Sequence, residues 1–82
     1  MMWKDEQARS LYMVAKDRTL SPGGRVTAVR DLGALACDGS GDAAWAIAEL
    51  MRHQESSFEV KREAGSQLAR VNEARKRGRR RF

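Results

Sequence analysis

The sequence predicts an all-α fold of four antiparallel amphipathic helices. Strand signals are poor, because no segment alternates apolar and polar residues for long and β-branched residues are sparse. Apolar residues instead recur at three- and four-residue spacing in four successive stretches separated by short turns. A chain of 82 residues suits one domain, which we place at residues 1–75, followed by a flexible basic tail at 76–82.

The first helix is expected at about residues 3–18. Its inner stripe consists of residues spaced three and four apart: Ala8, Leu11, Tyr12 and Ala15. The segment "TLSPGG" then interrupts the pattern. Ser21 followed by Pro22 indicates a new start, with Ser21 as the N-cap and proline at the first helical position, where its missing N–H costs nothing.

The second helix is expected at about residues 22–37. Its inner face is predicted from four apolar residues: Val26, Val29, Leu32 and Ala36. Gly33 lies within this helix and costs up to about 1 kcal/mol relative to alanine. We therefore expect a close contact with another helix at Gly33.

The third helix is expected at about residues 42–54, after the turn "DGSGD". Ser40 or Asp42 can cap it. The predicted inner face comprises Ala44, Ile47 and Met51. Trp45 falls on a different face and could line a second contact surface, since large aromatic residues often anchor interfaces.

The fourth helix is expected to begin at Ser56, because Ser56 and Glu59 have the spacing of a capping box. Its narrow apolar stripe comprises Val60, Ala64, Leu68 and Val71. We expect the helix to end near Arg75.

The basic charge is concentrated at the C-terminus. Residues 1–69 contain nine basic and ten acidic side chains, whereas residues 70–82 contain seven basic and one acidic. The candidate phosphate-binding residues are the basic ones of the tail: Arg75, Lys76, Arg77, Arg79, Arg80 and Arg81. A solvated end, an acidic protein, an acidic membrane surface and self-association remain alternatives. Phe82 is the only aromatic residue in the basic tail, so base stacking by the tail is not expected.

The middle of the chain resembles the short HEAT repeats of the PBS-lyase type. The similarity covers "RVTAVRDLGALACDGSGDAAWAIAELM" and "FEVKREAGSQLARV", in which Val29-Arg30 and Val60-Lys61 open corresponding units 31 residues apart. The chain departs from the pattern in lacking a proline in the first helix of each pair and in comprising about two units. The resemblance implies helical hairpins that present a concave surface to a partner, without catalysis. A plain four-helix bundle is the alternative fold.

The sequence contains no recognisable set of catalytic or cofactor-binding residues. His53 is expected to act as a favourable cation at a helix C-terminus, and Cys37 as a small buried residue. Glu55, Glu59 and Glu63 share one helical spacing, but a metal site is not expected because basic residues interleave with them. The glycines do not form a phosphate loop. The chain is therefore not expected to be an enzyme or to use a cofactor.

These observations predict a non-enzymatic binding or adaptor module. Its helix surfaces would hold an unidentified protein partner, with Trp45 as an anchor, and its basic tail would add electrostatic contact. The alternative is a nucleic-acid-binding protein that uses the tail for non-specific phosphate contacts. We expect a cytoplasmic protein without a membrane span, from a bacterium or phage, for which a homo-oligomer is one further option.

Overall fold

Four helices follow one another in the computed structural model, which describes residues 2–53 and 57–79. They are α1 (Glu6–Lys16), α2 (Pro22–Cys37), α3 (Gly41–Arg52) and α4 (Phe58–Arg79). No strand occurs within these two described ranges. The predicted all-α fold is therefore confirmed.

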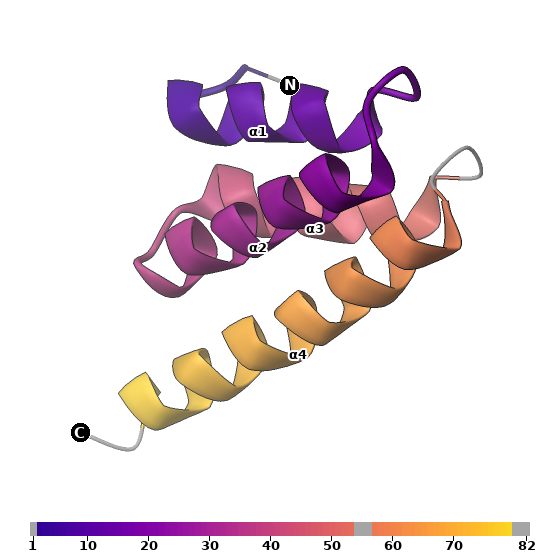
Figure 1. The fold of residues 1–82 in the computed structure, drawn as a ribbon. Coiled ribbons are helices and arrows are strands. Elements are labelled where there is room, and N and C mark those ends of the chain that lie inside the picture. Colours follow the sequence, from indigo (N-terminus) through magenta and orange to yellow (C-terminus); the bar gives the residue numbers. More distant parts are fainter. Residues whose placement is uncertain (1, 54–56, 80–82) are drawn as a thin grey trace.

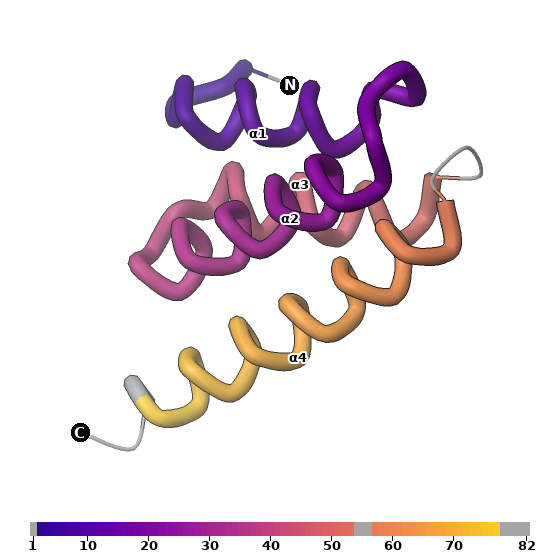
Figure 2. The backbone as a smooth tube through the Cα atoms, in the orientation of Figure 1, coloured from indigo at the N-terminus to yellow at the C-terminus, as the bar shows by residue number. Residues whose placement is uncertain are grey.

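Successive helices run in opposite directions, so that α2 and α4 are parallel to each other (Figure 1). Helices α2 and α3 pack together, and both α1 and α4 pack against this pair. The backbone tube shows α1 and α4 on opposite sides of α2 and α3 (Figure 2). Helix α1 also contacts α3, and α2 contacts α4, so the four helices can be grouped into an α1–α3 layer and an α2–α4 layer.

The first three helices begin at side-chain caps. Asp5 caps α1, since its Oδ1 accepts hydrogen bonds from the backbone N–H groups of Gln7 and Ala8 at 3.0 and 3.2 Å. Ser21 caps α2 and Pro22 is its first residue, as predicted. Ser40 caps α3.

Helix α4 differs from its expected limits at both ends. The helix starts at Phe58, and the Ser57 hydroxyl caps it by accepting a hydrogen bond from the Val60 N–H at 3.3 Å. Ser56, the expected start, lies outside the described residues. The helix continues to Arg79, four residues beyond the expected end near Arg75, so residues 76–79 are helical where we expected a tail. Arginine and lysine are good helix formers, which explains why the basic segment continues the helix.

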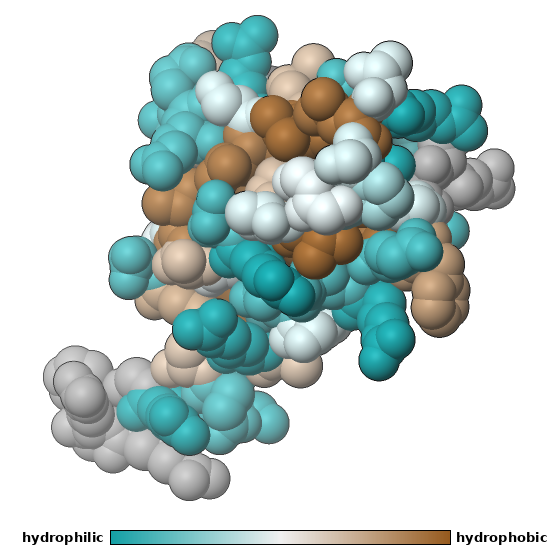
Figure 3. Space-filling model, viewed as in Figure 1, coloured by the Kyte–Doolittle hydropathy of each residue, from teal (hydrophilic) through white to brown (hydrophobic). Residues whose placement is uncertain are grey.

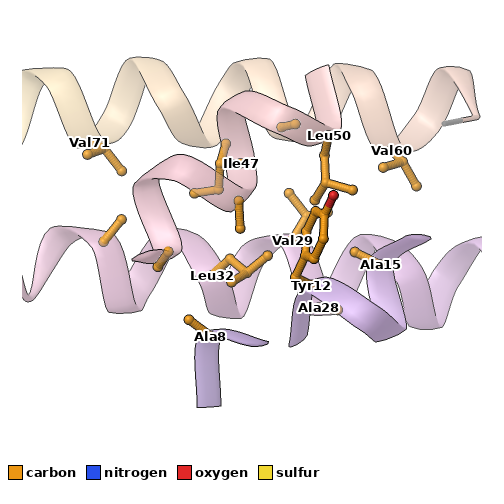
Figure 4. Packing of buried hydrophobic residues seen from close by; sticks show 14 residues of the cluster. Ala8, Tyr12, Ala15, Ala28, Val29, Leu32, Ile47, Leu50, Val60 and Val71 are labelled. Atoms are coloured by element: carbon orange, nitrogen blue, oxygen red, sulfur yellow. The ribbon is translucent and has the colours of Figure 1, made fainter. Parts of the chain in front are cut away.

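The core contains buried apolar side chains from all four helices (Figure 4). Its largest fully buried members are Leu32, Ile47, Leu50, Val29, Val60 and Val71. Seven core alanines, two each from α1, α2 and α3 and one from α4, allow the helix axes to approach closely. The predicted inner stripe of α1 is confirmed, with Leu11 partly buried beside three buried residues.

The predicted inner faces of α2 and α4 are confirmed for three of their four residues each, whereas the predicted face of α3 is shifted by about one residue. The confirmed residues are Val29, Leu32, Ala36, Val60, Ala64 and Val71. On α3 the buried residues include Ala46 and Leu50, whereas Met51 is 40% exposed. On α2 the Arg25 side chain is buried while Val26 is only partly covered. On α4 Gln67 is buried and Leu68 is partly covered. Arg25 and Gln67 were not predicted on the inner faces because both are polar, yet both side chains are buried between the helices.

Arg25 is buried because it completes the end of another helix. Its Nε donates a hydrogen bond to the Ala15 carbonyl oxygen at 2.9 Å. The last carbonyl groups of a helix lack partners within that helix and attract positive charge. Arg25 therefore joins the start of α2 to the end of α1.

Helices α2 and α4 make their closest approach at Gly33. A Cβ placed at Gly33 would overlap the side-chain amide of Gln67 and lie 3.1 Å from the Gln67 Cβ. Glycine is required here because the neighbouring helix occupies the space of a side chain. The close helix contact predicted at Gly33 is confirmed.

Candidate nucleic-acid interface

The C-terminal part of α4 extends beyond the packed helices. Val71 is the last fully buried residue on α4. From Asn72 to Arg77 every side chain is exposed except Ala74, which is partly covered. The hydrophilic end of this helix stands clear of the rest of the molecule in the space-filling view (Figure 3). The helix thus forms a solvated arm about two turns long.

The arm carries the predicted basic residues on a helical backbone. Arg75, Lys76 and Arg77 are exposed, and Arg79 is the last residue of α4. Arg80 and Arg81 lie outside the described residues. Successive residues of a helix point about 100° apart, so the arm is basic around its circumference rather than on one face. Arg77 Nε lies 3.9 Å from Glu73 Oε1, a long ion pair between exposed groups that only weakly offsets the positive charge.

The positive charge is also divided between the two helix layers. Helices α2 and α4 contain nine basic and four acidic residues, a net charge of +5. The other described residues, 2–21 and 38–53, contain five basic and six acidic residues, a net charge of −1. Residues 72–79, which form the arm, supply +3 of this charge, and the packed parts of α2 and α4 supply +2. A polyanion would therefore be attracted mainly to the arm.

A shallow groove lies between α2 and α4 on this basic layer. It is lined by residues of both helices: Val26, Arg30, Phe58, Glu59, Arg62, Glu63 and Ser66. Arg30 Nε donates to Glu63 Oε1 at 2.6 Å across the groove. Phe58 is 75% exposed, although it is an aromatic residue. Phe58 was not predicted for this site. It lies one turn before Arg62 on the same helix, but only the helix packing places it in one groove with Arg30.

Trp45 belongs to an aromatic cluster on the opposite layer. Its ring centroid lies 5.5 Å from that of Trp3 and 5.7 Å from that of Tyr12, and Trp3 and Tyr12 are also 5.5 Å apart. Such pairs stabilise a fold beyond their buried area. Trp45 remains 37% exposed, so its edge is accessible to a partner. Its role as a protein-binding anchor stays a prediction.

Two carboxylates connect the N-terminal segment to the turn before α3. Asp42 Oδ2 accepts hydrogen bonds from the backbone N–H groups of Lys4 and Asp5 at 2.6 and 2.8 Å. Asp5 Oδ2 accepts one from the Ser40 hydroxyl at 2.9 Å. The Ser40 hydroxyl, followed by the N–H of Ala8, holds the pKa of the Asp5 carboxyl below its usual range. This network explains how the starts of α1 and α3 are held together.

The remaining residues considered in the sequence are three glutamates, His53 and Cys37. Within the described residues, no three His, Cys, Asp or Glu side chains come together to hold a metal ion. Of the three glutamates considered, Glu63 pairs with Arg30, and Glu55 lies outside the described ranges. His53 follows α3 directly, at the expected helix end, and Cys37 is partly buried against the core.

Comparisons with known proteins do not assign a family. The chain matches no protein-family model, no curated protein and no solved structure. Over the residues that the structure describes, no helix is both long enough and apolar enough to cross a membrane. The candidate interface therefore depends on the charge, exposure and packing of the chain's own residues.

Proposed function

We propose that this chain is a non-enzymatic nucleic-acid-binding module that uses the basic arm of α4. The observation that carries the proposal is the exposure of Arg75, Lys76 and Arg77 on a helix that has left the core. A folded helix holds these cations in place before binding, so less conformational freedom is lost when phosphates are bound. Binding by such an arm is independent of base sequence and sensitive to salt, because cations on the protein displace condensed counterions.

Capture of a protein partner is the second candidate function. It is favoured by the exposed edge of Trp45 and by the groove between α2 and α4. Because Trp45 also packs on Trp3 and Tyr12, its substitution would disturb the fold as well as a partner. We therefore rank the arm of α4 above Trp45.

We further propose that the fold is HEAT-like. The resemblance pairs α2 with α3 and treats α1 and α4 as half-units; α2 packs on α4 and α1 on α3, so equivalent helices are neighbours, which supports this proposal. The Val-Arg and Val-Lys pairs that open the two repeat-like segments differ in position. Val60 lies in the first turn of α4, whereas Val29 lies in the middle of α2.

The test is fluorescence anisotropy with a labelled oligonucleotide at several salt concentrations. The informative variant replaces Arg75, Lys76 and Arg77 with glutamine. The matched control replaces three exposed cations of the other layer, Lys4, Arg9 and Arg18, with glutamine and changes the net charge equally.

The arm variant should lower affinity at least tenfold at low salt and reduce the slope of log K against log salt by about two to three. The control variant should keep the affinity at low salt and the salt slope within a factor of about two of those of the unaltered chain. Equal losses in the two variants would show that only net charge matters and would contradict the proposed arm. If the unaltered chain did not bind the oligonucleotide at low salt, the proposed nucleic-acid-binding function would be refuted.

A further inference from the structure

The α2–α4 groove adds an aromatic side chain to the basic surface. Phe58 is the first residue of α4 and is 75% exposed, the largest exposure of any described aromatic residue. Arg62 lies one helical turn further along α4, and Arg30 reaches the same groove from α2. An exposed aromatic ring flanked by guanidinium groups has the composition of a nucleotide-binding surface, in which the ring stacks on a base and the cations bind phosphates.

The arginines of α4 continue from this groove toward the arm. Arg62, Arg70 and Arg77 fall within about 80° of one another around the helix, so they share one side of α4. They extend over about 22 Å along the helix axis. Phe58 lies about 6 Å before Arg62 along the axis and about 40° from it around the helix, but about 120° from Arg70. The groove and the arm are therefore joined by a row of arginines, which we call the basic track, although Glu59 and Glu73 lie on the same side of the helix.

Arg30 has a fixed position in this track. Its Nε donates to Glu63 Oε1, and the Glu63 side chain is 15% exposed, whereas the Arg30 side chain is 63% exposed. The Glu63 carboxylate also offsets the charge of Arg30. A guanidinium group has five N–H donors in a planar fork, and Nε supplies one of them. Glu63 thus orients Arg30 beside the ring of Phe58.

We propose that the α2–α4 face binds single-stranded nucleic acid, with Phe58 stacked on a base and Arg62, Arg70 and Arg77 along the phosphates. This inference rests on the proposed function and specifies its ligand. A base can stack on Phe58 only where its flat face is open, and in a duplex neighbouring base pairs cover both faces. The basic track alone binds both forms of nucleic acid, so Phe58 supplies the preference for single strands.

The experiment compares a labelled oligothymidylate of about twelve nucleotides with a duplex of equal length. The full chain and three variants are tested: Phe58→Ala, Phe58→Leu and Phe58→Trp. Because Phe58 is exposed, these substitutions leave the core intact, which circular dichroism verifies. Leucine keeps an apolar side chain without an aromatic face, whereas tryptophan keeps the face.

The expected result is single-strand affinity reduced about five- to hundredfold by alanine and leucine, and retained by tryptophan. Duplex affinity should change less than twofold in all three variants. Unchanged single-strand binding by Phe58→Leu would overturn the stacking inference. If the full chain still bound both nucleic acids in a salt-dependent manner, the proposed function would remain.

A competitor distinguishes nucleic acid from other polyanions. Polyglutamate offers negative charge without bases, so it should displace the oligothymidylate poorly at matched charge concentration. Displacement as effective as that by unlabelled oligothymidylate would overturn the inference and would identify a general polyanion site. Binding of neither oligonucleotide by the full chain would refute the proposed function itself, and with it the role of Phe58.

Discussion

Replacing Gly33 with alanine should destabilise the protein, although the same change stabilises most helices. Within a helix, glycine is less favourable than alanine by about 1 kcal/mol. At Gly33, however, the new methyl group would overlap the Gln67 amide and lie 3.1 Å from its Cβ. Overpacking of this kind costs about 1–3 kcal/mol. We expect the net free energy of unfolding to fall by about 1 kcal/mol.

Gly65 provides the matched control, since it also lies inside a helix. Its added methyl group would meet only the Met51 Cε at 3.8 Å, an ordinary contact. Gly65→Ala should therefore raise the free energy of unfolding by up to about 1 kcal/mol. The two alanine variants should differ by about 2 kcal/mol, which urea denaturation followed by circular dichroism resolves.

Shortening Gln67 tests whether its side chain causes the penalty. Gln67→Ala removes the amide that an alanine at position 33 would overlap, but keeps the Cβ at 3.1 Å. The double variant should therefore recover only part of the loss, with a coupling energy of about 0.5–3 kcal/mol. If Gly33→Ala were as stable as the wild-type protein, the close approach of α2 and α4 would be refuted.

Two further predictions concern the junction between α1 and α3. Asp42→Ala removes the carboxylate oxygen that accepts from both the Lys4 and the Asp5 N–H groups, so the free energy of unfolding in a denaturation experiment should fall by about 1–3 kcal/mol. Asp38→Ala, an equal charge change in the same turn, should have little effect, and equal losses would contradict the role of Asp42. Because the folded pKa of Asp5 lies below its usual value of 3.8, its stabilisation is present above that pH and is lost as pH falls through the lower folded pKa. Asp5→Asn should therefore flatten the decline of stability in acid, and an unchanged pH profile would contradict this reasoning.

Much of the fold could be predicted from local sequence. The start of α2 depends on Ser21 and Pro22, which act on their own backbone, and the structure matches the predicted limits of that helix. The inner stripe of α1 was also recognised, because apolar periodicity reports which side of a helix avoids water. At the start of α4, two consecutive serines offered alternative caps, and the capping-box spacing selected Ser56 instead of Ser57.

The candidate site could be predicted only in part. Charge counting identified Arg75, Lys76 and Arg77, since a dense basic segment is visible without any structure. Phe58 was not recognised as part of the site, because it is 17 residues away from Arg75 in the sequence and its exposure is set by packing. Its proximity to Arg30 depends on the parallel packing of α2 and α4.

The sequence by itself determined the helical class, the helix starts marked by Ser21 and Ser40, and the basic C-terminal charge. These properties depend on residues close together in the chain, whose side chains act on their own or neighbouring backbone. Only the tertiary structure decided that Arg25 and Gln67 are buried and that Trp45 packs on Trp3. Each of these depends on which helices meet, and contacts between distant segments are not encoded in local periodicity.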